Sequence, residues 1–276
     1  MKVGLFIDIS NDYEVQIRHA KELGFDFGQL AVWNMDLYTE ETAEKLKSLL
    51  DELNFTVTDL WCGWSEPIIW KHPYKFTTLG LVPKEHRARR LEELKRGGRF
   101  AHKLGVKNII THTGFIPDNP TAEDHVGVVN ALKELCTELS ERGQSFSFET
   151  GQELPLTLNI VINEVGLDNV GVNFDPANLI SGGRGNPNDA MDLLGSRIFG
   201  MHAKDAIPPK FGDVGGKQVR IGEGRVDFER LFRQLKDLGY KGDIVIEHEM
   251  HDSTDRDGDI IRSKAYLEGI IKKVFA

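Results

Sequence analysis

The chain of 276 residues is 40% hydrophobic, which is enough apolar material for one large buried core. Its net charge of −9 at pH 7 argues against broad contact with nucleic acid or an anionic membrane, because both favour a basic surface. The two cysteines, Cys62 and Cys136, show no CxxC spacing, so neither a disulfide framework nor a thiolate zinc site is indicated.

The first residues and the apolar runs of the chain indicate where in the cell the protein is located. Residues 1–8 reach an acidic residue too soon for the apolar part of a signal peptide. No apolar run approaches the roughly 20 residues that a membrane span needs. We therefore expect a cytoplasmic protein with no membrane partner.

Strands and helices alternate in the first half of the predicted structure. Short β-rich runs bounded by turn residues predict strands over 2–7, 27–32, 56–61 and 107–112. Helix-forming residues, several at helical spacing, predict helices over 13–23, 40–53, 84–104 and 122–142. The long aromatic segment 63–83 is expected to be a lid or contact surface, or else a hydrophobic cluster beneath a loop.

The same alternation continues to the end of the chain. Strands are predicted over 146–149, 170–175, 198–202 and 243–247. Helices are predicted up to about residue 165 and over 188–194, 226–238 and 260–274. A loop rich in glycine and proline is expected over 207–224. Eight units of strand plus helix, with no linker, predict a single domain over residues 1–276.

Each strand of the second half ends in a residue that can bind a divalent metal ion. These residues are Glu149, Asp175, His202 and Glu247. Successive strand residues point to opposite faces, and here the face of each ligand carries mostly small or polar residues while the other carries bulky apolar ones. This pattern predicts an α/β fold of the (β/α)8 TIM barrel type, a parallel eight-stranded barrel with its site at the carboxyl ends of the strands.

The four residues form a mainly oxygen ligand set with one imidazole. Such a set suits Mn²⁺ or Mg²⁺ first, and Co²⁺ or Zn²⁺ as alternatives. One polar residue at a strand end would mean little. Four of these types on the inward parity make coincidence a poor explanation, so we expect one divalent metal ion as the cofactor.

Several motifs of the chain resemble those of the xylose isomerase-like TIM barrels. They are Glu149-Thr-Gly, Asn173-Phe-Asp175-Pro-Ala-Asn, Met201-His-Ala-Lys-Asp205, Gly222-Glu-Gly-Arg-Val-Asp-Phe228 and Val245-Ile-Glu-His248. That superfamily contains sugar and sugar-phosphate isomerases and epimerases, inosose dehydratase and the AP endonucleases of family 2. The resemblance implies a single metal ion held by the four residues above, and an acid/base pair formed by Glu149 and Glu247, as in the ketose epimerases of the family.

The activity implied is that of a metal-dependent sugar or sugar-phosphate isomerase or epimerase. It would remove a proton next to a carbonyl through an enediolate that the metal ion stabilises. A metal-dependent lyase or dehydratase of a keto-sugar or inosose, or a 3-keto-glycoside deglycosidase, remains the alternative. An AP endonuclease is disfavoured because Asn178 stands where that family has a histidine. The expected partner is a small sugar or cyclitol, and the aromatic segment makes a homodimer or homotetramer plausible.

Two further residues at strand ends are candidate substrate contacts. His112 ends the fourth strand, where it would hold a hydroxyl group or act as a further metal ligand. Lys204 lies two residues beyond His202 and would donate to the developing oxyanion. The alternative for Lys204 is a solvent-exposed lysine at a strand end.

Four other residues are weaker candidates for substrate binding. Gln152 and Glu153 would hydrogen-bond sugar hydroxyls or simply begin a helix, where acidic residues are favoured. Arg225 would bind a phosphate group. Trp33 would stack on sugar C–H groups, although ordinary packing explains a buried tryptophan equally well.

Overall fold

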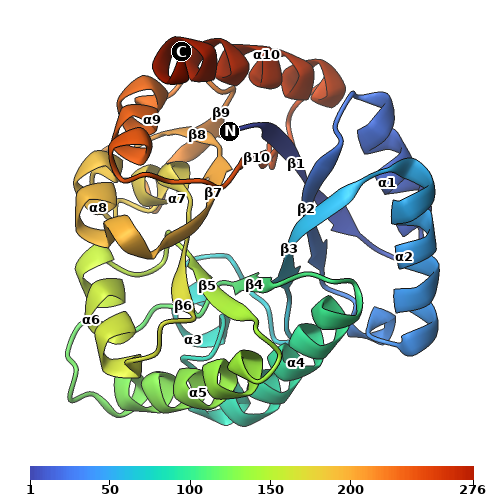
Figure 1. The fold of residues 1–276 in the computed structure, drawn as a ribbon. Coiled ribbons are helices and arrows are strands. Elements are labelled where there is room, and N and C mark those ends of the chain that lie inside the picture. Colours follow the sequence, from blue (N-terminus) through green and yellow to red (C-terminus); the bar gives the residue numbers. More distant parts are fainter. The chain divides into compact units, whose positions relative to one another are not determined.

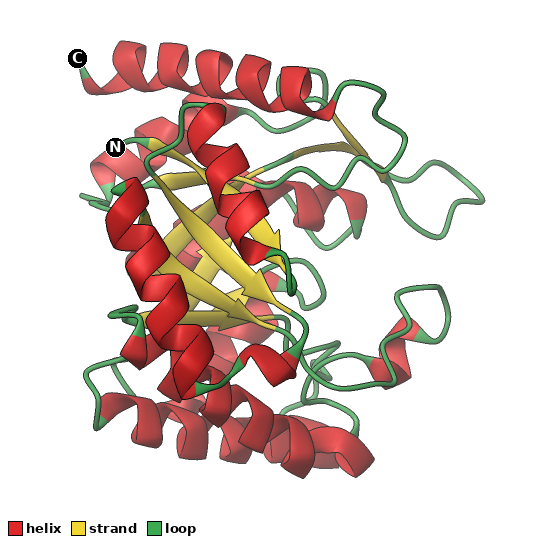
Figure 2. Ribbon diagram, turned by 90° about the vertical axis from the view of Figure 1, so that its right-hand side faces the viewer, coloured by secondary structure: helices red, strands yellow, loops and turns green.

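The computed structural model describes all residues from 1 to 276. Eight parallel strands form a closed barrel with helices around it, in the order β1-β10-β7-β6-β5-β4-β3-β2 (Figure 1, Figure 2). The predicted (β/α)8 TIM barrel is therefore confirmed. The chain forms two compact units, made up of Met1–Gly4, Glu149–Asn159 and Val172–Ala276, and of Leu5–Phe148 and Ile160–Gly171.

The barrel strands follow the predicted positions closely. They are β1 (Val3–Ile9), β2 (Phe27–Val32), β3 (Thr56–Cys62), β4 (Asn108–Thr111), β5 (Ser145–Glu149), β6 (Val170–Phe174), β7 (Ile198–Ala203) and β10 (Ile244–Ile246). The helices are α1 (Tyr13–Glu22), α2 (Glu40–Leu53), α3 (Lys75–Thr78), α4 (Lys84–Lys103), α5 (Glu123–Ser140), α6 (Pro155–Val165), α7 (Pro176–Ser181), α8 (Pro187–Leu194), α9 (Phe228–Asp237) and α10 (Arg256–Phe275). Two 3₁₀ turns, η1 (Met35–Leu37) and η2 (Gly195–Arg197), complete the helical elements.

Three features differ from the prediction. The expected loop over 207–224 contains an antiparallel hairpin made of β8 (Asp205–Ile207) and β9 (Lys217–Val219). The short helix α7 follows Asp175 directly, because the Asp175 side chain caps its first turn. Helix α10 begins four residues before the predicted start, because the side chain of Asp255 accepts a hydrogen bond from the Gly258 N–H and caps the helix there.

The unit containing β2, β3 and β4 packs its strands closely. All six residues of β2 are buried. Gly28 pairs with Leu5 in the parallel register of β1 and β2, and a Cβ atom at Gly28 would lie 2.1 Å from the Leu5 carbonyl oxygen. A glycine is therefore required at that position for the two strands to approach.

The other unit contains helix α9, whose apolar stripe shows why the helix forms. Asp227 caps it by accepting a hydrogen bond from the Arg230 N–H. Phe228, Leu231, Phe232 and Leu235 recur at helical spacing and are all buried. Burial of each of these side chains contributes about 2 kcal/mol to folding. In this structure, no helix combines the length and the apolar character that crossing a lipid bilayer requires.

Candidate metal centre

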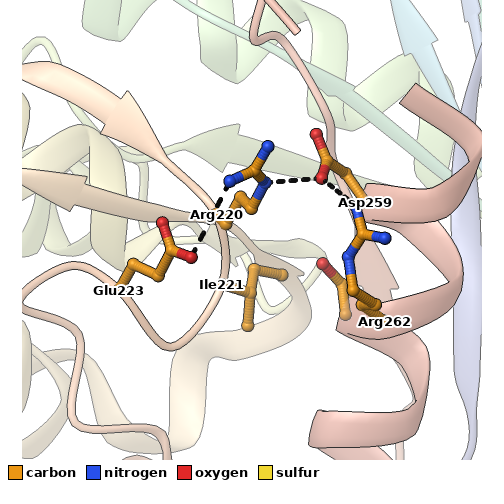
Figure 3. Close-up of a pocket in the computed structure, with 6 residues that line it drawn as sticks. Arg220, Ile221, Glu223, Asp259 and Arg262 are labelled. Carbon is orange, nitrogen blue, oxygen red and sulfur yellow. Dashed lines mark hydrogen bonds and ion pairs between the residues drawn. The ribbon is translucent and has the colours of Figure 1, made fainter. Parts of the chain in front are cut away.

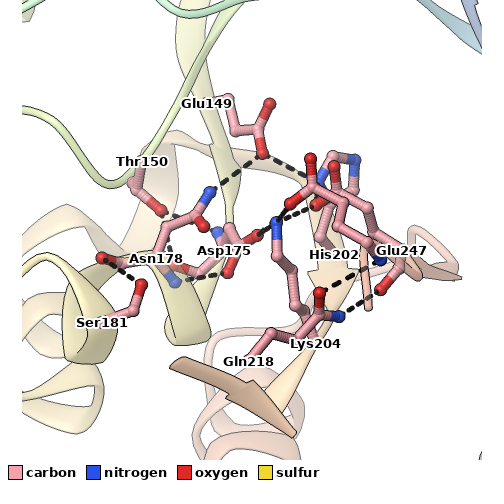
Figure 4. A network of polar contacts seen from close by, with 10 residues as sticks. Glu149, Thr150, Asp175, Asn178, Ser181, His202, Lys204, Gln218 and Glu247 are labelled. Atoms are coloured by element: carbon pink, nitrogen blue, oxygen red, sulfur yellow. Dashed lines mark hydrogen bonds and ion pairs between the residues drawn. The ribbon is translucent and has the colours of Figure 1, made fainter. Parts of the chain in front are cut away.

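The four predicted ligands meet in one place (Figure 4). Their ligand atoms all lie within 4.8 Å of one another, and all four side chains are buried. His202 Nδ1 lies 3.3 Å from Glu149 Oε1 and 3.2 Å from Glu247 Oε2. It lies 4.0 Å from Asp175 Oδ2. Residues from four parts of the chain thus come close enough together to bind one ion.

Strand pairing explains the convergence. Glu149 is the last residue of β5, and Asp175 directly follows β6. In the parallel register of β7 and β10, Val245 pairs with His202, and the Glu247 N–H donates to the Ala203 carbonyl at 3.1 Å. Since β5, β6, β7 and β10 are consecutive in the barrel, their carboxyl ends lie at the same edge.

Asp175 is fixed by contacts that leave one of its oxygens available. Its Oδ1 accepts from the Asn178 N–H at 2.9 Å, and its backbone N–H donates to Thr150 Oγ1 at 2.7 Å. Its Oδ2 is buried and makes no hydrogen bond. A buried carboxylate oxygen costs free energy unless something compensates it, and a cation shared with the other three ligands would do so.

The charges of the cluster perturb one another strongly. Burial raises the pKa of Asp175 to about 8, against the opposing effect of Lys204. Burial alone would lower the pKa of His202, but the carboxylates of Glu247 and Glu149 raise it well above its ordinary value. Burial would likewise raise the pKa of Glu247, but Lys204 and His202 lower it, so this carboxylate stays ionised. Such opposed shifts are common at functional sites.

The donor set and its geometry fit a divalent metal ion. Three carboxylates and one imidazole are ligands that Mn²⁺, Mg²⁺, Co²⁺ and Zn²⁺ accept. The buried Oδ2 of Asp175 makes no hydrogen bond, and its nearest cation, Lys204 Nζ, lies 3.5 Å away; this oxygen favours a bound ion over a purely structural network. The residues that would hold it are Glu149, Asp175, His202 and Glu247.

Lys204 is buried beside these ligands, so the alternative of a solvent-exposed lysine is wrong. Its Nζ lies 2.8 Å from Glu247 Oε2 and 3.5 Å from Asp175 Oδ2, and it also donates to Glu249 Oε2. Burial alone would lower the pKa of Lys204, but Glu247, Glu249 and Asp175 raise it well above its ordinary value. The ammonium group is therefore charged and held at the edge of the cluster.

The structure also locates three weaker candidates in the same unit. Gln152 and Glu153 are buried in the segment between Glu149 and helix α6. Helix α6 begins two residues after Glu153, so both residues precede the helix. Arg225 is exposed, and its backbone N–H donates to the Ala206 carbonyl at 2.9 Å.

His112 and Trp33 belong to an aromatic cluster in the other unit. The Trp33 ring lies 4.8 Å from that of Trp61 and 5.3 Å from that of Trp64. The His112 ring lies 5.9 Å from Trp61 and 5.6 Å from Trp70. The residues from segment 63–83 thus extend an aromatic cluster built on strand ends, as one of the two alternatives for this segment expected.

Asp205 is a buried residue for which we predicted no role from the sequence. Its Oδ1 accepts from the N–H groups of Ala206 and Val226, and its Oδ2 from those of Gly222 and Gly224. One carboxylate therefore ties the glycine-rich segment to the start of β8, which follows the strand that carries His202. The sequence signal that could have identified Asp205 is an acidic residue in a predicted strand, followed later by the segment Gly222-Glu-Gly224.

With this geometry in view, comparison with known proteins places the chain. Residues 17–270 match the family described as the xylose isomerase-like TIM barrel. The chain belongs to that family. A curated relative, the L-ribulose-5-phosphate 3-epimerase UlaE of Shigella boydii serotype 18, is 26% identical over 270 residues, which cover 94% of this chain and 89% of the relative.

Solved structures agree with this family assignment. A xylose isomerase domain protein from Planctomyces limnophilus is 31% identical with a TM-score of 0.92, covering 99% of this chain and 98% of that chain. A xylose isomerase-like TIM barrel protein from Mycobacterium smegmatis, solved in complex with magnesium, shares the fold at 18% identity. Its TM-score is 0.72, with 96% of this chain and 89% of that chain covered.

Proposed function

We propose that this chain is a divalent-metal-dependent sugar epimerase or isomerase that moves a proton on a carbon next to a carbonyl. The observation that carries the proposal is the buried cluster of three carboxylates and one imidazole, whose ligand atoms lie within 4.8 Å of one another. The epimerase activity named for the curated relative supports the same reaction class.

The two glutamates are suited to exchange a proton with a substrate between them. Glu149 ends β5 and Glu247 directly follows β10, the two outer strands of the run β5-β6-β7-β10. Asp175, just after β6, and His202, in β7, come from the strands between them. Lys204 and His202 lower the pKa of Glu247, so its side chain is in the ionised form that a base requires. One glutamate would remove the proton from one face, and the other would return a proton to the opposite face.

The charge that develops on the substrate oxygen needs stabilisation within the site. A divalent ion held by the four ligands would supply it as a Lewis acid, with Mn²⁺ our first expectation and Mg²⁺, Co²⁺ or Zn²⁺ as alternatives. Lys204 would donate a hydrogen bond to that oxygen, because its Nζ is charged and only 2.8 Å from Glu247 Oε2. Buried Gln152 and Glu153 are proposed to orient sugar hydroxyls.

An isotope-exchange assay tests the proposal. The Mn²⁺-loaded protein is incubated in D₂O with a panel of ketoses and ketose phosphates, and products are followed by NMR. We expect deuterium at the carbon next to the carbonyl together with an epimeric or isomeric sugar. Loss of water or of an aglycone instead would identify a lyase, and the absence of exchange with every substrate would overturn the proposal.

A further inference from the structure

The short segment that carries Glu247 receives little support from strand pairing. Strand β10 ends at Ile246, and the residues that follow have no regular secondary structure. The Glu247 N–H donates to Ala203, but the next two backbone positions need other partners. A proposed metal ligand just beyond a strand of three residues requires something else to fix its backbone.

The side chain of Gln218, from β9, supplies these bonds. Its Nε2 donates to the Glu247 carbonyl at 3.2 Å, and its Oε1 accepts from the Glu249 N–H at 3.1 Å. One amide group thus bonds the main chain at both ends of the segment Glu247–Glu249. Figure 4 shows Gln218 reaching toward Glu247 from the hairpin strand.

The bonds continue through side chains to form a closed ring. Glu249 accepts a hydrogen bond from Lys204, and Lys204 lies 2.8 Å from the Glu247 carboxylate. The ring therefore runs from Gln218 to Glu247, Lys204 and Glu249, and back to Gln218. A displacement of the Gln218 amide would release both the proposed ligand and the lysine beside it.

The residue after β9 is connected to the middle of the segment through Asp259. Arg220, two residues after Gln218, donates from Nε to Asp259 Oδ1 at 2.6 Å (Figure 3). The other oxygen of Asp259 lies 3.5 Å from His248 Nε2. Arg262 also donates to Asp259 Oδ1, at 2.6 Å, so this contact is anchored on helix α10.

The hairpin is in turn anchored to elements that carry other proposed ligands. Strand β8 begins three residues after His202, and its Ala206 pairs with Gln218. The Gly216 N–H donates to the Ser181 carbonyl of α7 at 2.7 Å. A Cβ atom at Gly216 would lie 2.2 Å from the Ile207 carbonyl oxygen, so the close approach requires glycine.

We infer that Gln218 is a positioning residue, which fixes the backbone of Glu247 and, through Glu249, the ammonium group of Lys204. The inference rests on the proposed function only in taking Glu247 as a metal ligand. Gln218 acts from outside the ligand set, so its loss would weaken metal binding without removing a ligand. Loss of such a supporting contact typically weakens metal affinity by about 10-fold to 100-fold.

Substitution of Gln218 by Met tests the inference, because Met has a similar length and offers neither amide bond. The matched control is Lys217→Met in the adjacent residue. Lys217 also connects the hairpin to the segment after β10, through an exposed ion pair with Asp252 of 2.8 Å. The dissociation constant for Mn²⁺ is measured by competition with a fluorescent chelator, and thermal unfolding is measured in the presence of excess chelator.

We expect Gln218→Met to weaken Mn²⁺ binding about 10-fold or more, with metal-free unfolding close to that of Lys217→Met. The Lys217→Met protein should bind Mn²⁺ as the parent does, because exposed pairs contribute little. Equal Mn²⁺ affinity of Gln218→Met and the parent would overturn the inference alone. A parent protein that binds no divalent ion would instead refute the metal site on which the proposed function depends.

Discussion

Arg90 and the ligand cluster are both buried and charged, and they differ in where their partners come from. Arg90 of helix α4 is fully buried, with 0% of its surface exposed. Its Nη1 donates to the carbonyls of Thr78 and Gly80 at 2.8 and 2.7 Å, and its Nη2 to those of Ser65 and Pro67 at 3.0 and 2.8 Å. The polypeptide itself therefore satisfies this cation completely.

The ligand cluster is buried to a similar degree but is not satisfied in the same way. Glu149, Asp175 and Glu247 bring three carboxyl groups together, while only His202 and Lys204 offer positive charge among them. One oxygen of Asp175 makes no hydrogen bond. Burial of charge alone therefore does not mark a functional site. What distinguishes the cluster is a deficit of donors that a bound cation would fill.

The largest effect should follow removal of a reacting group from the cluster. In Glu247→Gln the side chain keeps its size but can no longer accept a proton, so we expect turnover to fall about 1000-fold, which corresponds to about 4 kcal/mol. Initial rates with the substrate found in the exchange assay measure it. Circular dichroism should show an unchanged fold, and retention of normal turnover would contradict the role assigned to Glu247.

Removal of the Arg90 guanidinium group should lower the stability of the protein. Arg90→Met leaves two buried carbonyls, of Thr78 and Gly80, and two partly buried ones without their donor. We therefore expect the free energy of unfolding to fall by about 3 kcal/mol. Urea denaturation measures it. The control is Arg89→Met, since the neighbouring Arg89 side chain is 53% exposed. Equal losses of unfolding free energy in both variants would show that the buried Arg90 stabilises the protein no more than the exposed Arg89.

Removal of a charged group from the ligand cluster should instead raise the stability of the metal-free protein. The pKa of Asp175 is raised to about 8 by burial, so the carboxyl group is destabilised relative to the unfolded chain. The penalty is absent below about pH 4, where both states are protonated, and grows until about pH 8 as the unfolded chain ionises. Asn also caps helices well, so the cap of α7 should survive in Asp175→Asn.

We therefore expect Asp175→Asn to stabilise the metal-free protein by about 2 kcal/mol at pH 8, and by less at pH 5. Urea denaturation at the two pH values, in the presence of chelator, measures the difference. A variant that is less stable than the parent at pH 8 would show that the cluster is satisfied without a cation, as Arg90 is.

Local sequence patterns were sufficient to predict the barrel and the four strand-end residues that converge in it. The apolar alternation in residues such as Phe146 and Phe148 places the polar residue at the end of β5 on the inner face. Periodicity is a property of neighbouring residues, so it can be read along the chain. The convergence of Glu149 and Glu247 then follows from barrel closure, because parallel strands end at one edge.

Features that depend on contacts between distant residues could not be predicted in this way. Arg90 lies in a highly charged helix, and only the packing of segment 63–83 over it makes it buried. Strand β9 has three residues, too few to show a period of two. The burial of Lys204 depends on Glu247 and Glu249, about 45 positions away, which no local pattern reports.

The carboxylate of Asp205 has a consequence for how this enzyme family can vary. Its bonds to the N–H groups of Ala206, Gly222, Gly224 and Val226 close the base of the β8–β9 hairpin, while Phe211 in the connecting turn is fully exposed. Insertions or deletions in the turn can then be absorbed beyond the fastened base, leaving His202 undisturbed. The turn can therefore change in length while the strand that carries His202 keeps its position.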